Sequence, residues 1–114
     1  MTMSIIPASA AAAAAAESLT FPQRIVFVND SPGASDRVLL VQHAAPITIS
    51  LPTGMSANYQ LVIKDYNGFC SAVNTITLLC GGLETIDLAA TYDLDVPFMS
   101  VVLGCTGTGR YFIA

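Results

Sequence analysis

The sequence predicts an all-β protein, a small antiparallel β-sandwich or barrel-like module that follows an alanine-rich N-terminal arm. From residue 24 onward, short β-branched and aromatic segments recur at intervals of about 8–12 residues, and Gly, Pro, Asn and Asp clusters separate them. Several segments alternate between apolar and polar residues, which is typical of a strand with one buried face. The 114 residues have room for one small domain. We therefore expect an arm over residues 1–23 and a β domain over residues 24–114.

The arm is predicted to be extended or partly helical. Residues 10–16 are an uninterrupted alanine run, which favours a helix but is too short to be stable in isolation. No basic residue precedes Arg24, which argues against a secretory leader. Small side chains allow close contact with another surface, so we expect the arm to dock on partner subunits, with a disordered tail or linker as the alternative. The candidate anchoring residues are Ile5, Ile6, Ala10, Ala13, Ala16 and Leu19.

The β domain begins with an apolar segment at residues 25–28 that stops at the turn cluster 29–33. A clean alternation follows in residues 59–65, and Asn67-Gly68 directly after it is a strong hairpin signal. The glycine pair at residues 81–82 and a glycine-rich loop at residues 104–109 separate the later segments. The other predicted strands cover residues 38–43, 46–51, 74–79, 84–88, 91–96, 98–103 and 110–114.

The composition predicts a subunit of a homo-oligomer. The chain is 54% hydrophobic and 11% charged, whereas about 45–50% and about 25% are usual in soluble domains. Both faces of the segments 38–41 and 98–103 are apolar, so one face would pack in the core and the other against a neighbouring copy. The candidate interface residues are Val38, Leu40, Met99, Val101 and Leu103.

Several function classes are disfavoured. Four basic residues against eight acids give a net charge of −4 without a basic patch, which argues against nucleic acid and anionic membrane surfaces as partners. No apolar run reaches the roughly 20 residues of a membrane-spanning helix. The acids Glu84, Asp87, Asp93 and Asp95 lack the spacing of a calcium loop and are interpreted as solvated groups at strand ends.

The sequence also predicts no metal site, no cofactor and no enzymatic activity. Cys70, Cys80 and Cys105 are an odd set without C-x-x-C spacing, and we expect them to be reduced and buried. His43 is the single histidine, and its apolar surroundings favour a structural or surface role. The glycines of residues 104–109 precede a strand and not the helix that a phosphate-binding loop requires.

Residues 38–114 resemble a β module that recurs in virion proteins of tailed bacteriophages. The similarity is carried by a strand and turn at residues 59–68, which read YQLVIKDYNG, and by the strand NTITL at residues 74–78. It continues through ETIDLAATY at residues 84–92, through residues 92–103 and through GTGRYF at residues 107–112. Leu88 stands where the module usually has Gly, and Tyr111 stands close to its usual Trp.

The resemblance implies a non-enzymatic homotrimer of the virion that is assembled in the bacterial host cytoplasm. Because the chain is short, we expect a capsid decoration (cement) or head-fibre protein that binds the major capsid protein and stabilises the shell. A small tail, baseplate or fibre-adaptor protein, which would contact other virion subunits, is the alternative. A carbohydrate-binding β-sandwich is a third hypothesis, for which Tyr66, Tyr92 and Tyr111 are the candidate stacking residues.

Overall fold

The computed structural model describes residues 22–114, and these residues form nine strands and no helix. The prediction of an all-β protein is therefore confirmed for this part of the chain. The six candidate anchoring residues and the conformation of the arm lie outside the described residues. The strands are β1 (Gln23–Val26), β2 (Val38–Val41), β3 (Ile47–Ser50), β4 (Gln60–Asp65), β5 (Ile76–Leu79), β6 (Thr85–Ile86), β7 (Thr91–Leu94), β8 (Ser100–Cys105) and β9 (Arg110–Ile113).

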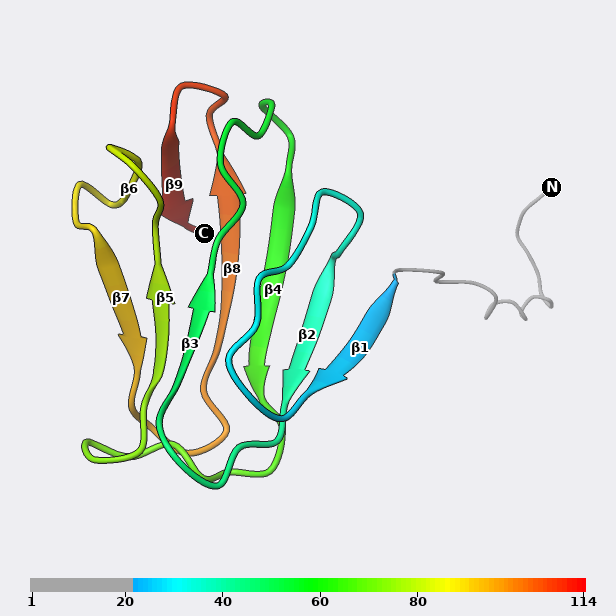
Figure 1. Cartoon of the computed structure of the whole chain (residues 1–114), viewed down its shortest axis with the longest axis vertical. Helices are drawn as coiled ribbons and strands as arrows, with labels where there is room; N and C mark the ends of the chain where they lie inside the picture. The colour runs from blue at the N-terminus through cyan, green and yellow to red at the C-terminus, as the bar shows by residue number, and fades with distance from the viewer. Residues whose placement is uncertain (1–21) are drawn as a thin grey trace, which may run out of the picture.

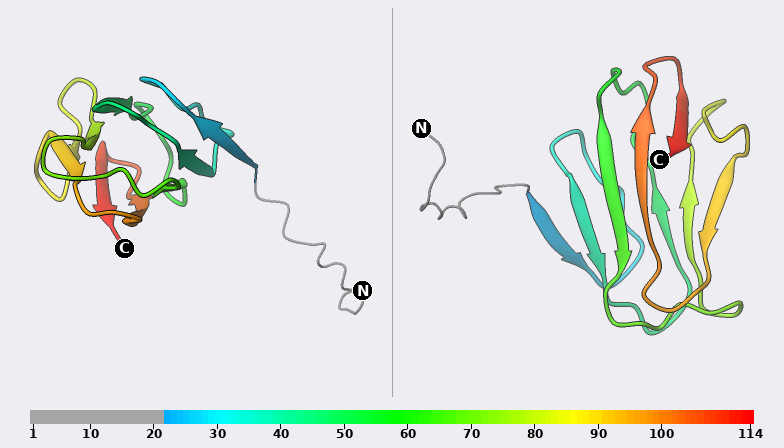
Figure 2. Two further views of the ribbon diagram at one scale, coloured as in Figure 1. Left: turned by 90° about the horizontal axis from the view of Figure 1, so that it is seen from below. Right: turned by 180° about the vertical axis from the view of Figure 1, so that it is seen from behind.

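The strands make two sheets that lie on opposite sides of one core (Figures 1 and 2). The larger sheet has the strand order β1-β2-β4-β8-β9-β6, and the smaller sheet has the order β3-β5-β7. Between residues 22 and 114 no helix is long and apolar enough to cross a membrane.

The sheets are mixed, which corrects the prediction of an antiparallel arrangement. Four of the seven strand pairings among the described residues are parallel. The parallel pairs arise because the chain alternates between sheets: β2 and β4 are parallel neighbours, while β3 between them in sequence belongs to the other sheet. Alternating hydrophobicity shows which side chains share a face, but it carries no information about the direction of the neighbouring strand.

The core consists of the inward residues of both sheets. Leu61 and Ile63 of β4 are fully buried, and their partners on β8 are Leu103 and Val101. From the smaller sheet, residues such as Ile76 are equally buried and belong to the same cluster. Cys70, Cys80 and Cys105 are buried and free, as expected for small apolar side chains.

The start of the domain is fixed by one arginine. Arg24 on β1 pairs with Asp30 at 2.6 Å and with Asp36 at 2.9 Å. Asp30 also connects the two sheets, because its backbone N–H donates to Thr48 and its carbonyl accepts from Ser50 of β3. The segment after β1 therefore passes from the larger sheet to the edge of the smaller one.

The turn between β6 and β7 is built from two residues in the left-handed region. Asp87 has φ of 47° and Leu88 has φ of 71°, and Ile86 and Ala89 exchange two backbone hydrogen bonds of 2.7 and 2.8 Å around them. These values are those of a type I′ hairpin turn, in which Asn and Gly are favoured. The chain thus keeps this turn although a leucine occupies the glycine position, which costs about 1 kcal/mol or more of backbone strain.

Candidate functional site

The outer face of the larger sheet has an apolar centre, although Gln60, Lys64 and Ser100 lie on the same face. Val38, Val62 and Val102 are cross-strand neighbours on β2, β4 and β8, and they form a continuous valine row on this face. Val38 and Val62 are half-buried and Val102 is 37% exposed, so part of the row remains accessible. Figure 2 (right) views the molecule from this side. Ile25, Leu40 and Phe112 extend the apolar surface on the neighbouring strands.

The outer face of the smaller sheet has the opposite character. Thr48, Thr77 and Asp93 are cross-strand neighbours on β3, β5 and β7, in the position that corresponds to the valine row. The Thr77 hydroxyl donates to Asp93 at 2.8 Å. One side of the module therefore suits water, whereas the other presents β-branched apolar residues of the kind found at subunit interfaces.

Close packing on the apolar face depends on one glycine. Gly104 of β8 lies opposite Phe112 of β9, and the phenyl ring of Phe112 covers it so closely that a Cβ on Gly104 would lie 2.3 Å from Cζ of the ring. Phe112 remains 42% exposed. The far end of the ring therefore covers Gly104, and the exposed part broadens the apolar surface.

The structure separates the five predicted interface residues. Val38 and Leu40 lie on the outer face of the larger sheet, as the prediction requires. Val101 and Leu103 do not, because both are buried in the core of the subunit, and Met99 packs against that core. The outward residue of this segment is Val102, so the two faces of β8 are exchanged relative to the prediction.

A second candidate site is the buried carboxylate of Asp65, at the end of β4. Its two oxygens accept four backbone N–H bonds of 2.9 to 3.3 Å, from Gly68, Phe69, Cys70 and Phe98. Burial by itself raises the pKa of this carboxyl, but the backbone donors outweigh it and hold the pKa below its ordinary value. Asp65 thus joins the loop after β4 to the loop before β8.

His43 and Cys70 complete a buried cluster around Asp65. His43 Nδ1 lies 3.8 Å from Asp65 Oδ1, and Cys70 Sγ lies 3.9 Å from His43 Nε2. His43 Nε2 contacts the carbonyl oxygen of Asn74 at 3.1 Å, while Nδ1 has no hydrogen-bond partner among the described residues. Sequence patterns did not reveal this cluster, since its three residues come from separate loops and strand ends.

The cluster has the residue types of both a metal site and a nucleophilic triad. Its three ligand atoms lie within 4.8 Å of one another, but the four backbone donors already occupy the lone pairs of the Asp65 carboxylate. Burial raises the pKa of the Cys70 thiol to about 12, which keeps it in the unreactive form. The carboxylate of Asp65 therefore acts as a structural clamp between two loops. His43 is fully buried, so the surface role that the sequence left open for it is wrong.

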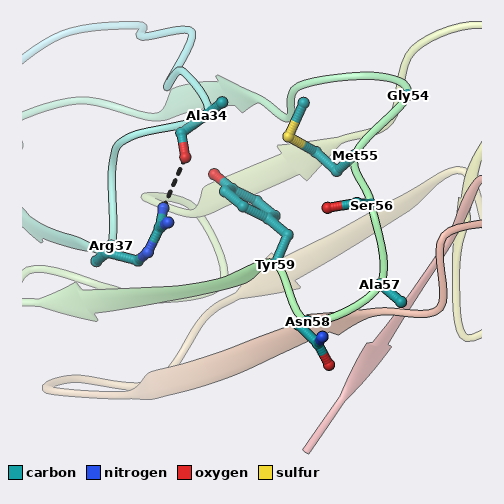
Figure 3. Close-up of a pocket in the computed structure, with 8 residues that line it drawn as sticks. All are labelled: Ala34, Arg37, Gly54, Met55, Ser56, Ala57, Asn58 and Tyr59. Carbon is teal, nitrogen blue, oxygen red and sulfur yellow. Dashed lines mark hydrogen bonds between the residues drawn. The ribbon is translucent and has the colours of Figure 1, made fainter.

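A shallow polar pocket lies at the end of the molecule where the loop 54–59 precedes β4. Its volume is about 560 Å³, and Arg37 and Tyr59 are its main polar groups (Figure 3). The guanidinium of Arg37 lies 5.5 Å from the centroid of the Tyr59 ring. Tyr59 in turn donates its hydroxyl proton to the carbonyl oxygen of Gly33, so the pocket wall is held in place from both sides.

The tyrosines proposed for carbohydrate stacking do not form one surface. Tyr111 is 2% exposed and donates to the carbonyl oxygen of Pro52 at 2.6 Å inside the module. Tyr92 is half-buried against the core, whereas Tyr66 is exposed. Comparison with known proteins gives no match to this chain, either among family models or among curated proteins.

Proposed function

We propose that this chain is a non-enzymatic structural protein of a tailed-bacteriophage virion, a small β-sandwich that assembles as a homotrimer through the outer face of its larger sheet. In this proposal it is a capsid decoration or head-fibre protein that binds the major capsid protein. The observation that carries the proposal is the contrast between the valine row on one face and the Thr48, Thr77 and Asp93 row on the other.

The valine row supports assembly because of its shape as well as its hydrophobicity. β-branched side chains on a pleated surface are stiff, so they lose little conformational freedom when a second surface covers them. Phe112 and Ile25 widen the surface from β1 to β9, across five neighbouring strands of the sheet. Removal of this area from water contributes about 25 cal/mol per Å² of apolar surface, which opposes the entropy lost on association.

Assembly is tested with a charge at the centre of the valine row. Val62→Asp is expected to leave the subunit folded and to convert the trimer to a monomer, because the new carboxylate would be buried without a partner at the interface. Light scattering after size-exclusion chromatography measures the mass, and circular dichroism measures the fold.

The matched control is Thr48→Asp, which places the same charge on the polar face of the smaller sheet, beside the neutral side chain of Thr77. This variant is expected to remain a trimer. A wild-type chain that stays monomeric at all protein concentrations would overturn the proposal, and so would a Val62→Asp variant with the mass of the wild-type oligomer.

The site of action is tested on purified particles. Antibodies against the β domain are expected to label the capsid shell of intact virions when viewed by electron microscopy. Labelling confined to the tail would instead establish the alternative, a tail, baseplate or fibre-adaptor protein. Particles without label would remove the virion function altogether.

The role of the arm is tested by deletion of residues 1–20. The truncated chain is expected to remain folded and trimeric, because every strand that the structure describes begins at or after Gln23. It is also expected to lose incorporation into particles, which is measured by immunoblotting of purified virions. Normal loading of the truncated chain would show that the arm has no anchoring role.

A further inference from the structure

We propose that the Asp87-Leu88 turn of one copy inserts into the Arg37 pocket of the next copy. This inference rests on the proposed homo-oligomer and deepens it, because it assigns the two surfaces that meet at each subunit boundary. The contact is heterologous, since a turn on one side of the chain meets a pocket on the other side. A heterologous contact closes into a ring when the rotation between copies is a simple fraction of a turn, such as one third.

The pocket is organised around a guanidinium without an acidic partner. Arg37 Nη1 donates to the carbonyl oxygen of Ala34 at 2.7 Å (Figure 3) and to that of Asp36 at 2.8 Å. Within residues 22–114 Arg37 forms no ion pair, and its Nε and Nη2 groups donate to no acceptor there. A fixed guanidinium with free donors, next to the side chain of Met55, fits a ligand that combines a carboxylate with a short apolar group.

The turn offers this combination. Asp87 and Leu88 are both exposed, and Leu88 is 73% exposed at the tip of the turn between β6 and β7. Asp87 forms no ion pair among the described residues. Both residues have positive φ values, and glycine in place of Leu88 would remove the backbone strain at that position.

The register of the larger sheet places turn and pocket at the same height along the strands. Ile86 pairs with Tyr111, and Tyr111 pairs with Cys105. The ring of Tyr111 meets the ring of Tyr59 edge to face at 6.4 Å, which continues the row to the pocket. Figure 1 shows β6 and the loop before β4 at the same end of the molecule. If the rotation axis runs along the strands with the valine rows facing it, the β6 edge of one copy meets the opposite edge of the next, where β1 and the loop before β2 that carries Arg37 lie.

Charge complementarity favours this pairing. Arg24 is already bound to Asp30 and Asp36, and Lys64 donates to the carbonyl oxygen of Phe98. Arg37 is therefore one of few cations left to receive an acid from a second copy. The chain has an excess of acids, with a net charge of −4, so each boundary that pairs an acid with Arg37 also relieves repulsion in the assembly.

A charge exchange tests the contact in the full-length protein. Arg37→Asp and Asp87→Arg are each expected to weaken trimer formation at least tenfold, and the double variant is expected to recover most of the wild-type affinity. Arg37→Asp combined with Asp93→Arg is the matched control, because Asp93 lies on the polar face of β7 and should give no recovery. Sedimentation equilibrium over a range of concentrations gives the association constants.

Leu88→Gly supplies a second test, because it is expected to raise the stability of the subunit and to weaken the association of subunits. Glycine relieves the left-handed strain, so the urea midpoint of the subunit is expected to rise in the monomeric Val62→Asp background. In the otherwise wild-type chain, loss of the leucine is expected to weaken association at least tenfold.

The outcomes separate this contact from the function on which it rests. A wild-type monomer would overturn both the homo-oligomer and the contact. A wild-type trimer whose association is unchanged by Leu88→Gly, or whose charge exchange shows no recovery, would overturn the contact alone. Recovery in the double variant together with weaker association of Leu88→Gly supports it.

Discussion

Asp65→Asn is expected to lower the free energy of unfolding by about 3 kcal/mol or more. The amide keeps one acceptor oxygen, but its NH2 group faces two backbone N–H donors in place of the second carboxylate oxygen. Those two donors, from Cys70 and Phe98 in the present geometry, lose charge-assisted hydrogen bonds of 3.0 and 2.9 Å. Bonds of this kind contribute roughly 1.5–3 kcal/mol each, and a buried donor without a partner carries its own cost. Urea unfolding at a fixed protein concentration measures the change.

Asp93→Asn is the control for this prediction. Asp93 is exposed on β7 and accepts one side-chain bond from the Thr77 hydroxyl. An amide oxygen accepts that bond equally well, so the free energy of unfolding is expected to change by less than about 0.5 kcal/mol. Equal losses of unfolding free energy in both variants would contradict the conclusion that Asp65 joins the loop after β4 to the loop before β8.

The same carboxylate predicts a specific dependence on pH. The folded protein holds the pKa of Asp65 below the ordinary Asp value of about 3.9. The stabilisation is therefore complete above this ordinary value and is lost as the pH falls through the lower pKa of the folded state. Between pH 5 and pH 2 the wild type is expected to lose more stability than Asp65→Asn, so the difference between them narrows on acidification. If the difference in stability between the wild type and Asp65→Asn stayed constant over this range, the ionised carboxylate of Asp65 would not be the cause of the pH dependence.

The alternation of the sequence predicted part of this arrangement. Tyr59, Leu61 and Ile63 share the buried face of their strand, and Asp65 continues the same alternation into the Asn67-Gly68 turn. A carboxylate on the buried side of a strand end is a usable signal for a structural clamp. Its partner Phe98 was not predictable, because this residue is 33 positions away and meets Asp65 only after β8 has paired with β4.

The positions of the strands were predictable and their pairing was not. Turn residues separate the apolar segments of the sequence, so the nine described strands all lie in or beside predicted segments. The mixed sheets depend on which strands meet across the core, and this choice is made by packing of the whole domain. The interface prediction failed on β8 for a related reason: Val101 and Val102 are identical in type, so only the pairing with Ile63 and Val62 decides which one is buried.

Because Val101 and Val102 lie on opposite faces of β8, the same substitution at the two positions is expected to have different consequences for folding and assembly. Val101 is 5% exposed and faces the core beside Ile63. Val101→Asp places an unpaired charge there, at a cost of about 3–5 kcal/mol. That is a large fraction of the roughly 5–15 kcal/mol that stabilises a domain, so the chain is expected to unfold. Circular dichroism and urea unfolding measure the loss.

Val102→Asp is the matched variant, on the outer face of the larger sheet. Its side chain is 37% exposed in the isolated subunit, so the subunit is expected to stay folded while the proposed trimer dissociates.

Alanine substitutions at the same two positions test the assignment of the faces if Val101→Asp cannot be purified. Val101→Ala should then cost about 2 kcal/mol of unfolding free energy in the monomeric Val62→Asp background, and Val102→Ala less than 1 kcal/mol. A folded Val101→Asp chain, or equal losses for the two alanine variants, would contradict the placement of the core face. A trimeric Val102→Asp would contradict the interface alone.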